Sequence, residues 1–270
     1  EMNFPLLNGV TGAQELEMTI SARSSEFTSG GIVGSGTVSN SPGEPSTTEI
    51  GIRWRPIDDV LVRFTKGETF RAPSVGTLYA GAGESFPSLA DVCNTVNFPL
   101  QSAPTQANCI AGGVPAGGAP QLDSQLRELQ GGNPQLKPEE GENMTLGVVY
   151  TPSQIEGLSL VLDAWSIELE NIVASISAGQ TMSRCYVENS VQDDAFCSFI
   201  VRTPTGAVQE IRSSSVNAAS NTVEGIDFGV RYEFDVDNYG SFVTAFDMTY
   251  YTKDEYAQSA TSTPSERFGY

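Results

Sequence analysis

The regular alternation of short and long connections between predicted strands constrains the fold of this chain more than any other feature. Apolar and polar residues alternate in about seven segments, and a period of two predicts β-strands. The segments lie at residues 16–23, 47–55, 60–68, 143–151, 158–169, 221–234 and 240–252. Between them lie short turns at residues 56–59, 152–157 and 235–238, and long excursions at residues 28–46, 70–133 and 170–220. The pattern favours a sheet with turns at one end and long loops at the other, an asymmetry that soluble β-sandwiches have no reason to show.

The composition supports an all-β chain in which each strand has an apolar and a polar face. The 270 residues include 27 Gly, and only 17% are charged. No segment reaches the ~18 apolar residues of a membrane-spanning helix, whereas barrel strands need only ~9–11 residues, half of them polar. We therefore expect an antiparallel transmembrane β-barrel segment whose apolar side chains face lipid. The charged residues expected to face a polar lumen are Arg23, Arg53, Arg63, Asp163, Asp227, Arg231 and Asp247.

Aromatic residues near the strand ends are expected to form the girdles that outer-membrane barrels carry at both membrane interfaces. The candidates are Trp54, Phe64, Tyr150, Phe234, Tyr239 and Tyr251. Trp165 occupies a polar position of its strand, so the alternation leaves its face open.

The connecting segments carry weaker local signals. Glycines and prolines predict a loop over residues 28–46, and short helical turns are expected at residues 75–79 and 122–129. A small hairpin is expected from residues 198–202 and 208–212. A turn region is expected before the first strand, where the chain contains Pro5, Asn8, Gly9 and Gly12.

The four cysteines fall into two pairs, each inside one long excursion. They are Cys93, Cys109, Cys185 and Cys197. Four cysteines allow three connectivities, and proximity within a loop favours Cys93–Cys109 and Cys185–Cys197, so each bond would staple one loop. Disulfides indicate an oxidising compartment such as the periplasm or the cell surface. Four free, buried thiols are the alternative.

The charge and the missing histidines exclude several classes of function. The net charge is −19, opposite in sign to what a nucleic-acid-binding surface needs. The chain has no His, so catalysis by histidine and metal sites with histidine ligands are excluded. The acidic pairs Glu139–Glu140 and Asp193–Asp194 lack the spacing of a calcium loop, and we interpret them as solvated acidic surface. The sequence thus predicts no catalytic residue, no metal site and no cofactor.

Several short motifs, in their order along the chain, resemble the barrel domain of TonB-dependent receptors. The first is Thr69–Ser74, with Phe70, Arg71, Ala72 and Pro73 after a strand. The second is Gly132–Glu139, with Asn133, Pro134, Leu136, Pro138 and Glu139 before the next strand. The third is Asn221–Asp227, with Gly225 and Asp227. Each motif alone is short, but their combination and spacing are typical of the family from about residue 49 to residue 251.

The resemblance implies a receptor in the Gram-negative outer membrane that takes up a scarce nutrient, such as a ferric siderophore, cobalamin or an oligosaccharide. Family members are transporters and not enzymes, with an N-terminal plug inside a 22-stranded barrel. The implied partners are outer-membrane lipid and lipopolysaccharide, the TonB complex, which would act through a region N-terminal to this chain, and a small nutrient ligand. The long loops would be extracellular.

The domain organisation expected from this resemblance is a partial barrel over residues 1–270, without the plug and the remaining strands. An open sheet of about seven strands would leave unpaired edges that a membrane does not tolerate, so the strands are expected to belong to a larger barrel. Within the motifs, we expect Pro73 to end a strand and Arg71 to pair with a carboxylate. Residues 136–139 are expected to fix the return of the loop into the barrel.

Two other classes of protein remain open at this point. A secreted, soluble all-β binding module, such as an adhesin or a carbohydrate-binding domain, would explain the composition, the acidity and the disulfides. It would not explain the alternation of short and long connections. A surface hydrolase with paired carboxylates is a weaker alternative, because no spacing in the sequence singles out a pair.

Overall fold

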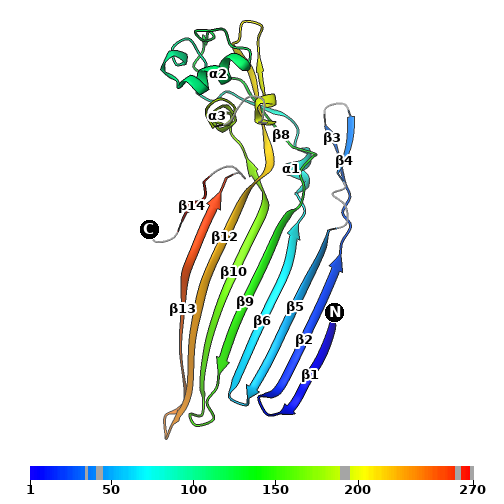
Figure 1. Ribbon diagram of the computed structural model, residues 1–270, viewed down its shortest axis with the longest axis vertical. Coiled ribbons are helices and arrows are strands. Elements are labelled where there is room, and N and C mark those ends of the chain that lie inside the picture. Colours follow the sequence, from blue (N-terminus) through cyan, green and yellow to red (C-terminus); the bar gives the residue numbers. More distant parts are fainter. Residues whose placement is uncertain (34–35, 41–44, 189–194, 259–262, 268–270) are drawn as a thin grey trace.

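A long antiparallel sheet forms the body of the molecule in the computed structural model, which describes residues 1–33, 36–40, 45–188, 195–258 and 263–267. Neighbouring strands follow the order β1-β2-β5-β6-β9-β10-β12-β13-β14, and the path ends at β1 and β14 without closing (Figure 1). The fold is therefore an all-β barrel segment. Its strands are β1 (Met2–Val10), β2 (Ala13–Ser24), β5 (Ser46–Ile57), β6 (Val60–Arg71), β9 (Glu139–Tyr150), β10 (Leu158–Ser175), β12 (Val208–Val236), β13 (Gly240–Ala257) and β14 (Ser265–Glu266).

The remaining elements gather at one end of the sheet, where the long connections lie (Figure 1). The strands there are β3 (Ser29–Val33), β4 (Gly36–Asn40), β7 (Gly83–Ser85), β8 (Glu128–Gly131) and β11 (Ile200–Arg202). The helical elements are α1 (Val75–Tyr79), η1 (Phe98–Leu100), α2 (Ala103–Ala111), α3 (Ala178–Ser183), η2 (Arg184–Glu188) and η3 (Ala195–Phe199). No helix among the described residues is long and apolar enough to cross a membrane.

The strand register separates an apolar face from a charged face, as the alternation predicts. One row across seven strands is apolar and consists of Met18, Ile52, Phe64, Leu146, Ala164, Ile226 and Tyr250. The adjacent row on the opposite face consists of Glu17, Arg53, Arg63, Gly147, Asp163, Asp227 and Thr249. Successive side chains of a strand point to opposite faces, so this register places the two rows on the two sides of the sheet.

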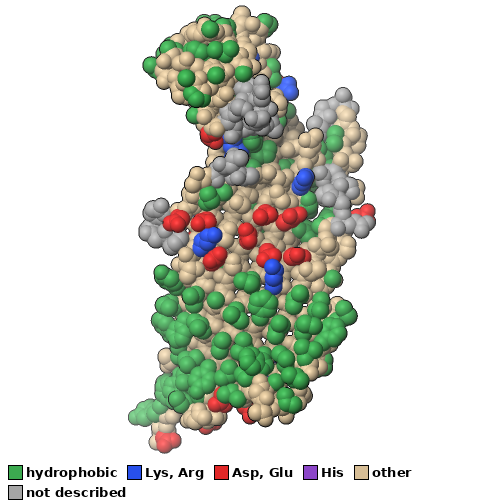
Figure 2. Space-filling model, viewed as in Figure 1, with side chains coloured by type: hydrophobic (Ala, Val, Ile, Leu, Met, Phe, Trp, Pro, Cys, Tyr) green, Lys and Arg blue, Asp and Glu red, His purple; other side chains and the backbone are tan. Residues whose placement is uncertain are grey.

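The apolar face forms a continuous band that ends at charged residues nearer the loops (Figure 2). Its side chains are solvent-exposed within this chain: 50% for Leu162, 56% for Phe246 and 63% for Tyr250. Along β12 the band runs from Phe234 to Ile226, about 26 Å along the strand, or roughly 20 Å along a barrel axis at the usual ~40° tilt. That height is close to the ~25 Å apolar band of outer-membrane barrels.

On the opposite, charged face, large side chains lie flat against the sheet over glycines. Arg63 and Asp163 form an ion pair of 2.6 Å between Nη2 and Oδ2, and the pair passes over Gly147. The indole ring of Trp165 lies over Gly225 and makes an edge contact with Tyr251, at 5.8 Å between ring centroids. The register thus settles the face of Trp165. It also shows that the expectation for Tyr251 was wrong, because Tyr251 lies on the charged face and not in an outer girdle.

The N-terminal segment differs from the sequence prediction of a turn region. Residues 2–10 form β1, which pairs with β2 through a tight turn at Gly12, where φ is 81°. Pro5 is accommodated at an irregularity, because the register between β1 and β2 shifts between Pro5 and Leu7. A proline lacks the N–H that a central strand needs, so edges and bulges are where sheets tolerate it.

Three other expectations were wrong in detail. Within residues 28–46, predicted as a loop, β3 and β4 form a hairpin. No helical turn forms at residues 122–129, and β8 instead pairs in parallel with the stretch of β12 around Ile211. Residues 208–212, predicted as the second strand of a small hairpin, and residues 221–234, predicted as a separate strand, belong to one strand, β12, which is 29 residues long. The predicted helical turn at residues 75–79 is confirmed as α1, with Ser74 as its N-cap.

Candidate functional site

The candidate functional site is a compact unit at the loop end of the sheet, which we call the loop module. Its first segment is residues 72–138, and its second segment is the described part of residues 176–215, namely 176–188 and 195–215. Two disulfides lie in it, Cys93–Cys109 in the first segment and Cys185–Cys197 in the second. This is the pairing within each loop that the sequence favours. The cysteines bonded in this way hold short stretches together, with sequence separations of 16 and 12.

One hydrophobic core joins the two segments of the loop module. Side chains from both segments are less than a tenth exposed and pack together; they are Cys93, Phe98, Cys109, Val114, Ala119, Leu126, Ala178, Met182, Cys185, Tyr186 and Ile211. Loops without a core of their own would be mobile, whereas a shared buried core makes the two segments a single folded body. The long connections therefore form structure of their own.

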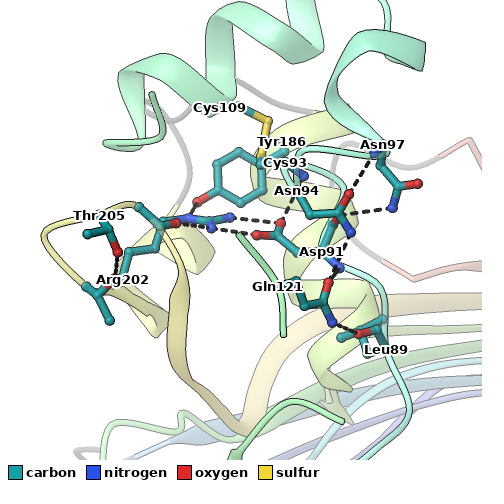
Figure 3. A network of polar contacts seen from close by, with 12 residues as sticks. Leu89, Asp91, Cys93, Asn94, Asn97, Cys109, Gln121, Tyr186, Arg202 and Thr205 are labelled. Carbon is teal, nitrogen blue, oxygen red and sulfur yellow. Dashed lines mark hydrogen bonds and ion pairs between the residues drawn. A yellow bond between two sulfur atoms is a disulfide. The ribbon is translucent and has the colours of Figure 1, made fainter. Parts of the chain in front are cut away.

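A buried ion pair crosses the core of the loop module (Figure 3). Arg202, at the end of β11, donates from Nη1 to Oδ2 of Asp91 at 2.6 Å and from Nη2 to Oδ1 at 3.0 Å. It also donates from Nη1 to the carbonyl oxygen of Gly206 at 2.7 Å and from Nε to Oη of Tyr186 at 2.9 Å. The side chains of Arg202 and Asp91 are only 6% and 3% exposed. Two parallel N–H···O bonds between a guanidinium and a carboxylate fix geometry as well as charge.

Burial and the ion pair shift two pKa values inside the loop module. Burial raises the pKa of the Tyr186 hydroxyl above its usual value, although the nearby guanidinium of Arg202 opposes this. Burial alone would lower the pKa of Arg202, but its hydrogen bonds to Asp91 and the neighbouring Tyr186 outweigh that effect and raise the pKa. Arg202 therefore stays charged and Tyr186 neutral under physiological conditions.

A second group of hydrogen bonds holds the segment that carries Asp91 (Figure 3). The Oε1 atom of Gln121 accepts from the backbone N–H of Asp91 at 2.8 Å and from Nδ2 of Asn94 at 3.1 Å. The Nε2 atom of Gln121 donates to the carbonyl oxygen of Leu89 at 2.8 Å. Every polar atom of this amide is used, so Gln121 acts as an internal brace of the loop module.

The carboxylate of Glu128 ties the two segments together near the sheet. Glu128 is only 4% exposed, and its Oε1 accepts from the backbone N–H of Ala178 at 3.0 Å and from Oγ of Ser213 at 2.5 Å. Its neighbours in β8 pair in parallel with β12. A buried carboxylate is stable in a protein only when such donors replace its water shell. Glu128 thus anchors α3 and β12 to the first segment.

A groove opens on the loop module between its two segments. It has a volume of about 570 Å³ and runs between residues 120–127 of the first segment and residues 203–209 of the second. Arg127, on its wall, forms ion pairs with Glu84 at 2.6 Å and Glu210 at 2.7 Å. The volume is within the range of small-molecule sites, ~300–1,000 Å³.

The first motif of the sequence analysis lies at the junction between sheet and loop module. Arg71 pairs with Glu139 across the facing ends of β6 and β9, and Oε1 of Glu139 accepts from the backbone N–H of Val173 at 2.7 Å. The predicted partner of Arg71 is therefore a carboxylate on the adjacent strand. Phe70 makes an edge contact with Phe27, at 5.3 Å between ring centroids. Ala72 and Pro73 follow the end of β6 and lead into α1.

The second motif returns the chain from the loop module into β9. Nδ2 of Asn133 donates to the carbonyl oxygen of Ser215 at 3.0 Å, and its backbone N–H donates to Thr77 at 2.9 Å. Pro134 follows Asn133 directly in this return. Leu136 is 1% exposed and packs with Leu78 and Tyr79 in a small second core. Pro138 is also buried.

Sequence reasoning missed the residues that hold the loop module together, namely Asp91, Arg202, Tyr186, Gln121 and Glu128. The only local signals were charged residues inside short apolar stretches, as at Arg202 after Phe199, Ile200 and Val201. Asp193 and Asp194 lie outside the described residues. No group of three or more Cys, Asp or Glu side chains in the described part of the chain could hold a metal ion.

Comparisons with known proteins show to which family this chain belongs. Its sequence matches the family described as TonB dependent receptor-like, beta-barrel, over residues 15–270. The chain belongs to the TonB-dependent receptor family. A comparison with curated protein sequences gave no match.

Solved structures of similar fold include other receptors. The siderophore receptor PirA from Acinetobacter baumannii is 13% identical, with a TM-score of 0.48, over 95% of this chain and 27% of that one. The ferric enterobactin receptor PfeA from Pseudomonas aeruginosa is 13% identical, with a TM-score of 0.48, over 96% and 38%. The RagAB peptide importer is 10% identical, with a TM-score of 0.45, over 94% and 21%. The chain thus spans well under half the length of each of these structures.

In this member of the TonB-dependent receptor family, the third motif lies within the sheet. Gly225 has no side chain, and an added Cβ would come within 2.5 Å of the Trp165 ring. Asp227 pairs in register with Asp163 on the charged face, and its Oδ1 is buried with no hydrogen-bond partner among the described residues. The structure therefore places this motif in the sheet, in the part of β12 that follows the loop module.

Proposed function

We propose that this chain is part of an outer-membrane receptor that captures a scarce nutrient outside the cell and passes it inward with energy from TonB. The observation that carries the proposal is the combination of an exposed apolar band of membrane height with a folded loop module at one end of the same sheet. A water-soluble protein would lose stability and solubility with so large an apolar surface exposed. The band therefore argues against the secreted binding module.

Some steps of uptake would be carried out by this chain and the others by the rest of the receptor. The apolar band would contact lipid, with lipopolysaccharide at the level of the charged residues above it. The loop module would face the outside and capture the ligand. The plug, the remaining strands and the contact with TonB would lie in parts of the receptor outside this chain. No residue of the chain is assigned a chemical step, so the receptor would act by binding and not as an enzyme.

The ferric siderophores, cobalamin and oligosaccharides remain the ligand classes for this function. The motif residues at the junction, such as Arg71 and Glu139, are proposed to fix the loop module on the sheet and not to contact ligand, because their charges are already paired with each other.

Growth under nutrient limitation tests the proposed function. Cells with the full-length receptor, cells without it, and cells with the receptor but with inactive TonB would be compared under limitation for iron, for cobalamin and for glycan as carbon source. We expect one limitation under which growth requires both the receptor and TonB. Equal growth of all three strains under every limitation would contradict the proposal.

A further inference from the structure

The groove on the loop module has walls that are held in place before any ligand arrives. Asp91, which lines the groove, is fixed by Arg202 and Gln121, and the hairpin on the other wall is fixed by the bond from Arg202 to Gly206 (Figure 3). The two walls come from different segments of the loop module, and the ion pair between Asp91 and Arg202, 111 positions apart, joins those segments. Preorganised walls reduce the entropy lost on binding, which distinguishes a built site from a gap between mobile loops.

The charge of the groove is unsuitable for an anion. Among the described residues that line it, Arg127 is the only cation, and its guanidinium is shared between Glu84 and Glu210. Asp91 is neutralised by Arg202, while Asp123 has no cationic partner in the described part of the chain. An anionic ligand in the groove would therefore be repelled by the carboxylate of Asp123 and would find no cation free to bind it. At longer range, the net charge of −19 would also repel it.

The groups left free in the groove are two neutral amides and the carboxylate of Asp123, beside apolar surface. Gln125 and Gln209 are exposed, and neither side chain has a hydrogen bond to the described residues. An amide offers both donors and acceptors, and the carboxylate of Asp123 accepts. Phe86, 51% exposed, and Leu122, 94% exposed, supply apolar contact on the same groove. Hydroxyl groups on a ring with apolar C–H faces match this set, because each hydroxyl both donates and accepts.

We propose that the groove between residues 120–127 and 203–209 binds a neutral oligosaccharide. The inference rests on the proposed uptake function and narrows its ligand class. The groove would be an outer capture site on the loop module, with Gln125, Gln209 and Asp123 bonding to hydroxyls and Phe86 packing against a sugar ring.

Binding to the full-length receptor in detergent tests the inference. The probes are maltotetraose, cellotetraose and xylotetraose, with the ferric tris-catecholate anion as an anionic probe, measured by calorimetry. We expect one of the three sugars to bind more tightly than the anion. Gln209→Ala and Gln125→Ala should each weaken that sugar about threefold to tenfold, the effect of one lost hydrogen bond. Gln154→Ala, an exposed glutamine at the turn end of the sheet, is the matched control and should change nothing.

Three results would overturn the inference: no binding of any of the three sugars, sugar binding that is unchanged in both groove variants, or tighter binding of the anion than of every sugar. Circular dichroism and protease resistance of each variant show whether the loop module is still folded, and Gln209→Glu provides a second variant that keeps size and adds charge.

Failure of the groove proposal is distinguishable from failure of the proposed function. A receptor that supports TonB-dependent growth but binds no sugar contradicts only the groove, whereas equal growth with and without the receptor contradicts the uptake function itself.

Discussion

At the scale of single residues, glycines decide which side chains can lie flat on the charged face of the sheet. A Cβ at Gly147 would come within 1.9 Å of Oδ1 of Asp163 and 2.8 Å of Nε of Arg63. The Arg63–Asp163 pair can therefore bridge across β9 only because position 147 has no side chain. Gly51 is a useful contrast, since a Cβ there would make an ordinary contact of 3.7 Å with Thr19.

Gly147→Ala should therefore destabilise the receptor more than Gly51→Ala. The added methyl group must displace the ion pair, and overpacking of this kind lowers the free energy of unfolding by about 1–3 kcal/mol. Urea titration of the full receptor in detergent, followed by its mobility shift on gels, measures the difference. Equal stability of the two variants would show that the pair does not depend on the glycine.

The buried pair Arg202–Asp91 should contribute far more to stability than an exposed one. Asp91→Ala would leave the guanidinium charged in an almost dry site, and removal of one partner of a buried pair lowers stability by about 3–5 kcal/mol. Hydrogen exchange of residues 93–126 reports this loss. The control is Lys66→Met, which removes an exposed pair with Glu142, 2.9 Å long, and should change stability far less than Asp91→Ala. Unchanged protection in Asp91→Ala would contradict the role of the pair.

At the scale of elements, seven strands of the sheet could be predicted from the sequence, whereas β1 and the loop module could not. The strands alternate with a period of two along continuous stretches, so local pattern carries the information. The loop module instead depends on partners far apart, such as Asp91 and Arg202, which are separated by 111 residues. Local signals also failed where tertiary pairing decided the outcome, as for β8, whose strand exists because β12 lies beside it.

Some elements were missed although local signals existed. The helix α2 begins at the N-cap Ser102 with a proline in its first turn, which are ordinary start signals, but the surrounding Gly-, Ala- and Pro-rich sequence favours a loop. In the candidate site, the cysteine pairs followed from the sequence, as did the expectation that Arg71 pairs with a carboxylate, although not that this carboxylate is Glu139. The groove did not, because its walls come from two segments that only the folded core brings together.

The disulfides should stabilise the loop module without being required by the sheet. Replacement of Cys93 and Cys109 by Ser together removes a crosslink that closes about 16 residues, which corresponds to roughly 3 kcal/mol. We expect faster proteolysis of the loop module and an unchanged mobility shift of the barrel. If both parts of the receptor lost stability equally, the loop module would not be a separate folding unit.

At the scale of the whole molecule, the apolar band and the loop module together define a direction across a membrane. The band lies between the short turns and the charged residues near the loops (Figure 2), and the loop module extends beyond those charges (Figure 1). If the band lies in the outer membrane with long loops outward, the turns at residues 152–157 and 235–238 lie in the periplasm. This orientation decides whether the loop module can reach a nutrient outside the cell.

The most direct test of that claim is labelling of single added cysteines on intact cells with a membrane-impermeant maleimide. Ala116→Cys lies on the exposed surface of the loop module and Gln154→Cys in a short turn at the opposite end, and the four native cysteines are already bonded. If the loop module faces the outside, Ala116→Cys is labelled on intact cells, and Gln154→Cys is labelled only after the outer membrane is permeabilised. Labelling of Gln154→Cys on intact cells, or protection of Ala116→Cys, would contradict an outer-membrane barrel with the loop module outside.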